Sequence, residues 1–237
     1  MQRKPRFSGI LLVAVLMVVV LLFVSLSPLV AASASKHVNY SDIYYYFQNQ
    51  QVTSYRLDRN TTGLVLFGKN SDALRTLNRY IWEDRISKFY RTIVFGNLEK
   101  KLELHGRLEK DSGTNTVAIY DVNETEGRAI ETIVTPIQPL RNSTLVEVDL
   151  VTGRTHQIRA HLASIGHPVI GDGKYAKGPA KGFNHRLYES CHLSTQLLHS
   201  YRLEFRNCDG PLEYLNGRVF EAPLPEQFEE ILEELSK

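Results

Sequence analysis

The amino-acid sequence predicts an α+β fold, built on a largely antiparallel sheet with flanking helices. Several segments typical of β-strands follow one another with polar turns between them, and segments with helical spacing occur among them in a mixed order. At 237 residues, the chain is long enough for one large domain or two small ones with a sizeable buried core. Its apolar fraction of 43% and charged fraction of 23% are those of an ordinary globular protein.

Seven runs rich in apolar, β-branched or aromatic residues predict strands. They cover residues 64–67, 88–96, 102–108, 116–122, 130–140, 143–150 and 197–205. The fifth and sixth of these runs are separated only by Arg141 and Asn142, so we expect them to form an antiparallel pair.

Apolar residues at helical spacing predict three helices. They cover residues 72–82, 155–165 and 226–235, and Ser71 or Asp72 is expected to cap the first of them. Residues 36–53 are polar and aromatic, and they read as a short helix or strand that leads into a loop.

The first 35 residues differ from the rest of the chain. A basic start is followed by an entirely apolar run at residues 10–24 and by small residues at 31–34, as in a signal peptide. The segment carries no charge between Arg6 and Lys36, so it is also long enough to span a bilayer. We therefore expect residues 1–35 to be a signal-like or membrane-anchor segment, with membrane contact through residues 10–30, and residues 36–237 to be the folded domain.

Charge and cysteine content narrow the function classes only slightly. The net charge is +2, but residues 56–91 contain eight Lys and Arg residues against four Asp and Glu residues. Such a basic region suits a polyanionic substrate, and it is equally common as a solvated face. Cys191 and Cys208 form no Cys-x-x-Cys motif, which argues against a disulfide framework and against a cysteine-based zinc site.

One carboxylate in the basic region is a candidate nucleophile or base. Asp58 lies between Arg56 and Arg59 and is followed by a Thr-Thr-Gly turn and the apolar run 64–67. Neighbouring guanidinium groups favour the ionised carboxylate, and loops before buried strands often carry functional residues. The alternative is a surface aspartate in a turn.

A second dense group of polar residues occupies positions 150–162. If the helix begins at Thr155, then Thr155, Arg159 and Leu162 share one face, and an inward-facing arginine needs a carboxylate partner. Asp58 is the natural candidate. His156, Gln157 and His161 resemble metal ligands, but their spacing does not fit one helical face, and no carboxylate accompanies them. We therefore expect no metal site.

Four segments of the chain carry motifs in a recognisable order. Residues 55–64 read Tyr-Arg-Leu-Asp-Arg-Asn-Thr-Thr-Gly-Leu, and residues 88–96 read Lys-Phe-Tyr-Arg-Thr-Ile-Val-Phe-Gly. Residues 152–159 read Thr-Gly-Arg-Thr-His-Gln-Ile-Arg and are followed by Gly-His-Pro-Val-Ile-Gly-Asp and Tyr175, and residues 198–205 read Leu-His-Ser-Tyr-Arg-Leu-Glu-Phe. These resemble, in order, the catalytic, tyrosine and arginine motifs and the closing strand of the RluA-type RNA pseudouridine synthases. The resemblance covers about three quarters of the chain.

The resemblance implies a pseudouridine synthase-type mixed sheet and the isomerisation of uridine to pseudouridine in ribosomal or transfer RNA, with no metal or organic cofactor. Asp58 would start cleavage of the glycosidic bond by attacking the sugar, attacking the base or removing a sugar proton. Arg159 would pair with Asp58, and Tyr90 would stack on the flipped uracil and assist the last proton transfer. The residues expected to bind substrate are Arg56, Arg59, Thr62, Arg154, His156 and Gln157.

The chain departs from the family pattern in two ways. Tyr55 replaces the usual His and Thr62 the usual Ser, which are conservative changes. The strand and Lys-Pro loop that normally precede the catalytic motif, and the S4-like domain often found before them, are not visible, so we expect a catalytic domain that is incomplete at its N-terminus. An incorrect start, an anchor on an inactive relative, or an organelle-directed presequence would each explain the apolar segment.

The function expected from the sequence is therefore that of a cytoplasmic, monomeric RNA pseudouridine synthase. The apolar segment, if genuine, points instead to the membrane or to export. Two other functions stay open: a catalytically inactive, membrane-anchored RNA-binding relative, and a secreted acid–base hydrolase that uses Asp58 with a histidine.

Overall fold

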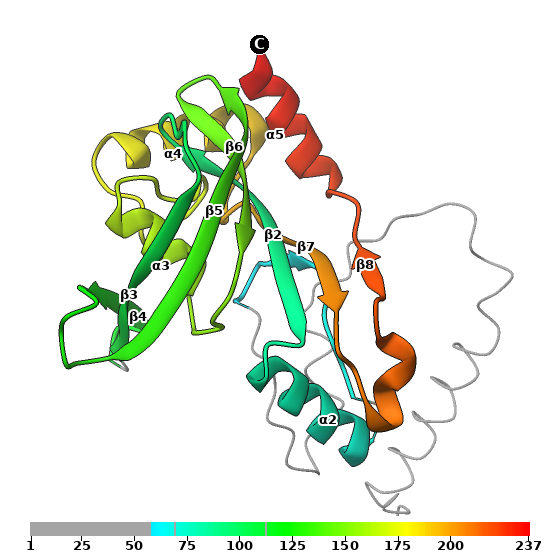
Figure 1. Cartoon of the computed structure of the whole chain (residues 1–237). Helices are drawn as coiled ribbons and strands as arrows, with labels where there is room; N and C mark the ends of the chain where they lie inside the picture. Colours follow the sequence, from blue (N-terminus) through cyan, green and yellow to red (C-terminus); the bar gives the residue numbers. More distant parts are fainter. Residues whose placement is uncertain (1–57, 69, 112) are drawn as a thin grey trace, which may run out of the picture. The chain divides into compact units, whose positions relative to one another are not determined.

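The computed structural model describes residues 58–68, 70–111 and 113–237. In this part of the chain, eight strands form one sheet in the order β1-β7-β2-β6-β5-β3-β4, and β8 also pairs with β7 (Figure 1). The β1–β7 pair is parallel, and all other neighbours are antiparallel. The predicted α+β fold with a mixed, largely antiparallel sheet is confirmed.

The elements have the following bounds. The strands are β1 (Thr62–Gly63), β2 (Ile86–Phe95), β3 (Leu102–Asp111), β4 (Thr116–Tyr120), β5 (Arg128–Leu140), β6 (Ser143–Asp149), β7 (Leu198–Phe205) and β8 (Val219–Glu221). The helices are α2 (Ser71–Trp82), α3 (Gln157–Ser164), α4 (Pro179–Cys191), the 3-10 helix η3 (Gly210–Leu215) and α5 (Glu226–Ser236).

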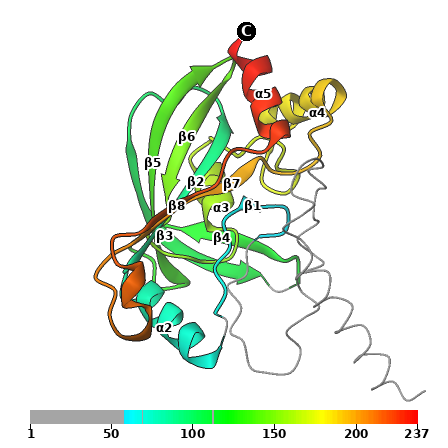
Figure 2. The ribbon, with the colours of Figure 1, turned by 90° about the vertical axis from the view of Figure 1, so that its right-hand side faces the viewer.

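The central strand β2 is buried on both of its faces, because successive side chains of a strand point to opposite sides. Tyr90 and Val94 belong to the core cluster that includes Ile158 of α3. Ile93 belongs to a second cluster, to which α4 and α5 contribute. Figure 2 shows α4 and α5 at the same end of the sheet, with α3 beside its middle. The sheet thus holds α3 against the face on which Tyr90 lies.

Strongly patterned segments were predicted correctly. Strand β2, strand β7 and helix α5 form within two residues of their predicted bounds. Strands β5 and β6 are joined at Arg141 and Asn142, and Leu140 pairs with Ser143. Asn142 has a φ of 53°, a left-handed conformation that Asn adopts more readily than most residues.

Two predictions around the first strand and helix are wrong. Residues 64–67 do not form a strand: β1 covers only Thr62–Gly63, and after the hydrogen bond from the Leu64 N–H to the Ser200 carbonyl (2.9 Å) the chain leaves the sheet. Neither Ser71 nor Asp72 caps α2. Asn70 does, because its side-chain oxygen accepts the Ala73 N–H at 2.8 Å.

The helix predicted at residues 155–165 starts later, at Gln157. His156 precedes it with a φ of 54°, and this left-handed residue cannot continue a helix. Thr155 therefore does not share a helical face with Arg159, as the sequence had suggested.

Three elements were not predicted: α4, η3 and β8. Helix α4 buries Ala180, Phe183 and Leu187, whose spacing of three and four is helical. Gly178, Pro179 and Gly182 obscured this pattern, because together they resemble a loop.

The predictions for residues 1–35 and for residues 36–53 concern a part of the chain outside the described residues. In the part of the chain that is described, no helix is both long and apolar enough to cross a membrane.

Candidate active site

Asp58 occupies the first position of a tight turn. The Thr61 N–H donates to the Asp58 carbonyl at 3.0 Å, and Asn60 takes a left-handed φ of 71°. The buried Gln196, just before β7, donates its side-chain N–H to the Arg59 carbonyl. The backbone of the turn is therefore fixed from the neighbouring segment, and sequence reasoning gave no sign of the part played by Gln196.

Gly63 and Thr62 attach this turn to β7. The φ of Gly63 is 98°, and a Cβ there would lie 2.1 Å from the Ser200 carbonyl oxygen, so only glycine fits. The Thr62 hydroxyl lies 2.8 Å from His199 Nδ1, and His199 Nε2 lies 3.3 Å from the Ala222 carbonyl. Since Nε2 must donate to that carbonyl, Nδ1 accepts from Thr62, whose hydroxyl is thus engaged within the protein.

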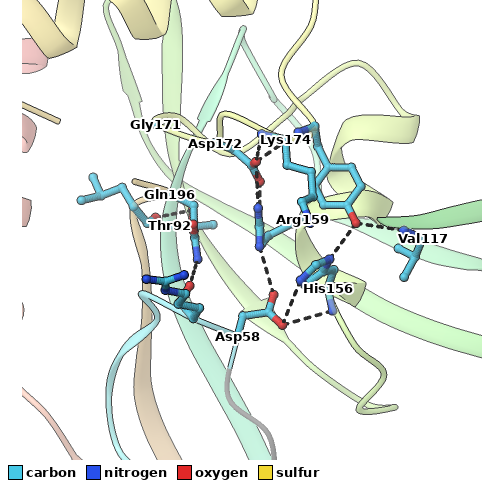
Figure 3. A network of polar contacts seen from close by, with 12 residues as sticks. Asp58, Thr92, Val117, His156, Arg159, Gly171, Asp172, Lys174 and Gln196 are labelled. Carbon is cyan, nitrogen blue, oxygen red and sulfur yellow. Dashed lines mark hydrogen bonds and ion pairs between the residues drawn. The ribbon is translucent and has the colours of Figure 1, made fainter. Parts of the chain in front are cut away.

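Arg159 lies between two carboxylates (Figure 3). Its Nη1 lies 3.5 Å from Asp58 Oδ2, which confirms the predicted proximity of these two side chains. Its Nε and Nη2 donate to the two oxygens of Asp172, at 2.7 and 2.9 Å. The stronger, bidentate partner of Arg159 is therefore Asp172, which was not among the predicted site residues.

The charged groups of Arg159 and Asp172 are buried, so each needs the other as a charge partner. Asp172 is fully buried and Arg159 is 6% exposed. Burial opposes the charge of Arg159, but the hydrogen bond to Asp172 and the charges of Asp172 and Asp58 leave its pKa raised above the ordinary value. The backbone N–H groups of Lys174 and Tyr175 also donate to Asp172 Oδ1, at 2.8 and 3.1 Å. Asp172 therefore fixes the Arg159 side chain and the backbone of the loop at Lys174 and Tyr175.

His156 and Tyr175 lie on the other side of the Asp58 carboxylate. The His156 backbone N–H donates to Asp58 Oδ1 at 3.3 Å, and His156 Nε2 lies 3.8 Å from the same oxygen. The other ring nitrogen, Nδ1, lies 2.8 Å from the Tyr175 hydroxyl. Burial lowers the pKa of His156, with Asp58 opposing the effect and Arg159 adding to it. His156 was predicted as a substrate contact, and the structure places it beside the candidate carboxylate.

Gln157 and Arg154 have different surroundings. Gln157 is buried, its Oε1 accepts from Thr152 and from the Arg154 N–H, and its Nε2 donates to the Glu131 carbonyl and to Thr132. Its amide is therefore fully satisfied within the protein. The Arg154 side chain is exposed.

Tyr90, on β2, lies near Asp58 in a buried environment. Its pKa is raised to about 12, chiefly by burial, while a hydrogen bond with Ser200 opposes the rise and the charge of Asp58 adds to it. Tyr90 is therefore neutral near physiological pH. Its aromatic ring and protonated hydroxyl lie close enough to Asp58 for the carboxylate charge to affect the pKa of the tyrosine.

The side chains of the remaining predicted residues lie apart from this network or belong to residues that the structure does not describe. The Arg59 side chain is exposed, and Arg56 belongs to the undescribed residues. His161 is buried, with its Nδ1 3.0 Å from the Thr132 hydroxyl. Across residues 58–68, 70–111 and 113–237, no group of three or more His, Cys, Asp or Glu residues lies close enough to hold a metal ion.

The geometry defines a fixed carboxylate. Oδ2 of Asp58 faces Arg159, Oδ1 faces the His156 N–H, and the Asp58 side chain is 13% exposed. A carboxylate held by an ion pair on one oxygen and a backbone N–H on the other is suited to act as a nucleophile or base.

The sequence matches a family model described as RNA pseudouridylate synthase over residues 29–164. The chain is 32% identical over 177 residues to ribosomal large subunit pseudouridine synthase D of Zymomonas mobilis, and these residues cover 74% of this chain and 53% of that protein. It is 33% identical over 184 residues to ribosomal large subunit pseudouridine synthase C of Haemophilus influenzae, covering 76% and 54% of the two chains. The chain therefore spans just over half the length of these two relatives.

Solved structures show the same fold. Human RNA pseudouridylate synthase domain containing 4 superposes with a TM-score of 0.60 at 21% identity, covering 76% of this chain and 74% of that one. Human RNA pseudouridylate synthase domain containing 1 gives 0.54 at 22% identity, covering 76% and 78%. Fold and site thus define a pseudouridylate synthase-type domain. The chain belongs to the RNA pseudouridylate synthase family and is of the RluA type.

Proposed function

We propose that the chain is an enzyme that isomerises specific uridines to pseudouridine in RNA. The observation that supports this most directly is the Asp58 carboxylate, held at 3.5 Å from the buried Arg159 where the catalytic and arginine motifs of the family meet. The reaction detaches uracil and joins it again through carbon, so no atoms or electrons are gained or lost overall. No metal or organic cofactor is needed for that balance.

In the proposed mechanism, Asp58 starts cleavage of the glycosidic bond. Arg159 keeps the carboxylate ionised and oriented, and Tyr90 stacks on the uracil and assists the last proton transfer. A base inside folded RNA must leave its stack before it can react, which favours a site with an aromatic platform. Tyr90 supplies an aromatic ring close enough to Asp58 for the carboxylate charge to act on it.

The predicted substrate contacts divide into two groups. We propose that Arg56 and the exposed Arg59 and Arg154 contact RNA phosphates, because surface guanidinium groups bind phosphate in bidentate geometry. Thr62, His156 and Gln157 have protein partners, so we propose that they act by shaping the site.

We propose that ribosomal RNA is the first substrate class to test, since two relatives are named as large-subunit enzymes, with transfer RNA as the second. The catalytic domain falls within residues 36–237, and the chain works as a monomer in the cytoplasm, where these RNAs are. Fractionation of cells that express the full chain tests whether residues 1–35 direct it to a membrane instead.

A tritium-release assay tests the function. The full-length protein is incubated with ribosomal and transfer RNA that carry tritium at uracil C5, because isomerisation frees that position. Asp58→Ala is compared with Asp121→Ala, a matched change at an exposed aspartate in the turn after β4.

Release by the wild type and by Asp121→Ala, but not by Asp58→Ala, is the expected result. Folded wild-type protein that binds both RNAs and releases no tritium would overturn the proposal and would favour the inactive RNA-binding relative.

A further inference from the structure

A short chain of polar atoms connects the backbone of β4 to the candidate carboxylate. The Val117 N–H donates to the Tyr175 hydroxyl oxygen at 3.1 Å, and this oxygen lies 2.8 Å from His156 Nδ1. On the other side of the imidazole, Nε2 lies 3.8 Å from Asp58 Oδ1. Figure 3 shows His156 between Val117 and Asp58.

Counting protons indicates the direction of these hydrogen bonds. The Tyr175 hydroxyl oxygen accepts the Val117 N–H. Its own single proton therefore needs an acceptor. Among the described residues, the acceptor within hydrogen-bond distance is His156 Nδ1. A neutral imidazole that accepts at Nδ1 carries its own proton on Nε2, the nitrogen that faces Asp58.

The other two states of His156 fit less well. With the proton on Nδ1, the Nε2 lone pair would face the carboxylate oxygen, and the tyrosine proton would lack this acceptor. A doubly protonated ring would face the cations Arg159 and Lys174 as well as the anions Asp58 and Asp172, and it would be largely buried. Burial is the largest influence, and it lowers the pKa of His156.

We infer that Tyr175 is a positioning residue that holds His156 as its neutral Nε2–H tautomer, so that an N–H donor faces Asp58. The carboxylate then has a cation beside one oxygen, and beside the other it has the donated His156 backbone N–H and the facing Nε2–H, with no second positive charge. The tautomer itself is independent of the proposed function, whereas its effect on rate rests on that function.

The surroundings of Tyr175 allow a clean test. Its ring makes an edge-to-face contact with His156 (centroids 5.7 Å apart) and lies 5.2 Å from the Arg159 guanidinium carbon. Tyr175→Phe keeps the ring for both contacts and removes the hydroxyl, which is also the acceptor of the Val117 N–H. Tyr188→Phe, on the exposed side of α4, is the matched control.

The first measurement is spectroscopic. The full-length protein is labelled with ¹⁵N-histidine, and a long-range ¹H–¹⁵N correlation spectrum near neutral pH reports which ring nitrogen carries a proton. Because the chain has eight histidines, His156→Gln identifies the His156 signals. The expected result is the Nε2–H form in the wild type and in Tyr188→Phe, with a mixture of tautomers in Tyr175→Phe. A wild-type His156 that is Nδ1–H or doubly protonated would overturn the inference.

The second measurement is the single-turnover rate of tritium release. Tyr175→Phe should lower the rate up to about tenfold, the range for one lost hydrogen bond, while RNA affinity stays at the wild-type value. A Tyr175→Phe enzyme with the wild-type rate would contradict the catalytic effect. If the wild type itself releases no tritium, the proposed function fails, and the spectrum of the wild type still decides the tautomer.

Discussion

Two clusters of arginine and acidic side chains in the described chain differ in burial and in charge balance. At the surface, Arg79 of α2 and Arg85 share the single carboxylate of Asp209, which is 53% exposed in its side chain. In the interior, the single guanidinium of Arg159 is shared by Asp58 and Asp172. Glu83 also contacts Arg79 and Arg85, at 3.8 and 2.6 Å, so the surface cluster is balanced in charge. The interior cluster has two carboxylates for one guanidinium and is therefore negative in excess.

The comparison shows that burial distinguishes the candidate site from a surface ion-pair cluster. Hydrogen bonds from Arg79 and Arg85 lower the pKa of Asp209 to about 2, yet water competes for all three groups. Arg159 and Asp172 are buried, so water competes little for them, and their geometry is held by each other, by Asp58 and by backbone N–H groups. A site that must present a carboxylate in one orientation gains from this arrangement.

The largest contrast is expected in activity when each arginine is changed to lysine. Arg159→Lys keeps the charge but loses the bidentate geometry with Asp172, so the single-turnover rate should fall by about 100-fold or more. Arg85→Lys should keep the wild-type rate on the same RNA. Equal losses in the two variants would break the distinction between the clusters.

A second contrast concerns stability. Asp172→Asn leaves the buried Arg159 without its closest charge partner and should lower the free energy of unfolding by about 3 kcal/mol. The measurement is urea unfolding followed by circular dichroism, with Asp209→Asn as the surface counterpart. We expect a much smaller change for Asp209→Asn, and a larger one would show that burial does not set the cost.

The smallest effect is a pH dependence of the surface cluster. The folded-state pKa of Asp209 is about 2 against an ordinary value of 3.8, so its ion pairs stabilise the protein above about pH 4. This contribution is lost as the pH falls through about 2. The stability difference between the wild type and Asp209→Asn should therefore be constant near neutral pH and shrink in acid. A difference that grows in acid would contradict the assigned pKa direction.

What the sequence could predict about the fold depended on how local each signal is. The β5–β6 pair and α5 follow from alternation or helical spacing within a few residues, so they were found. Helix α4 carries its apolar spacing among glycines and a proline, and its local composition pointed to a loop. The start of α3 depends on one left-handed residue, His156, which no periodicity reveals.

The candidate site, like the fold, was predictable only where the signal is local in the sequence or follows from a general need for charge pairing. The need of Arg159 for a carboxylate indicated Asp58 correctly, because an unpaired buried charge is costly. Asp172 is the closer partner because the loop after α3 brings it back to Arg159. Gln196 fixes the turn at Arg59 through a contact between segments that are far apart in the sequence. Such long-range contacts leave no pattern in one sequence.

The central claim is that the buried cluster, and not the surface one, performs the chemistry. Single-turnover tritium release from one RNA substrate, measured for Asp58→Asn and Asp209→Asn of the full-length chain, tests it most directly. We predict release at the background level for Asp58→Asn and at the wild-type rate for Asp209→Asn. A wild-type rate in Asp58→Asn, or an equal loss in both variants, would contradict the claim.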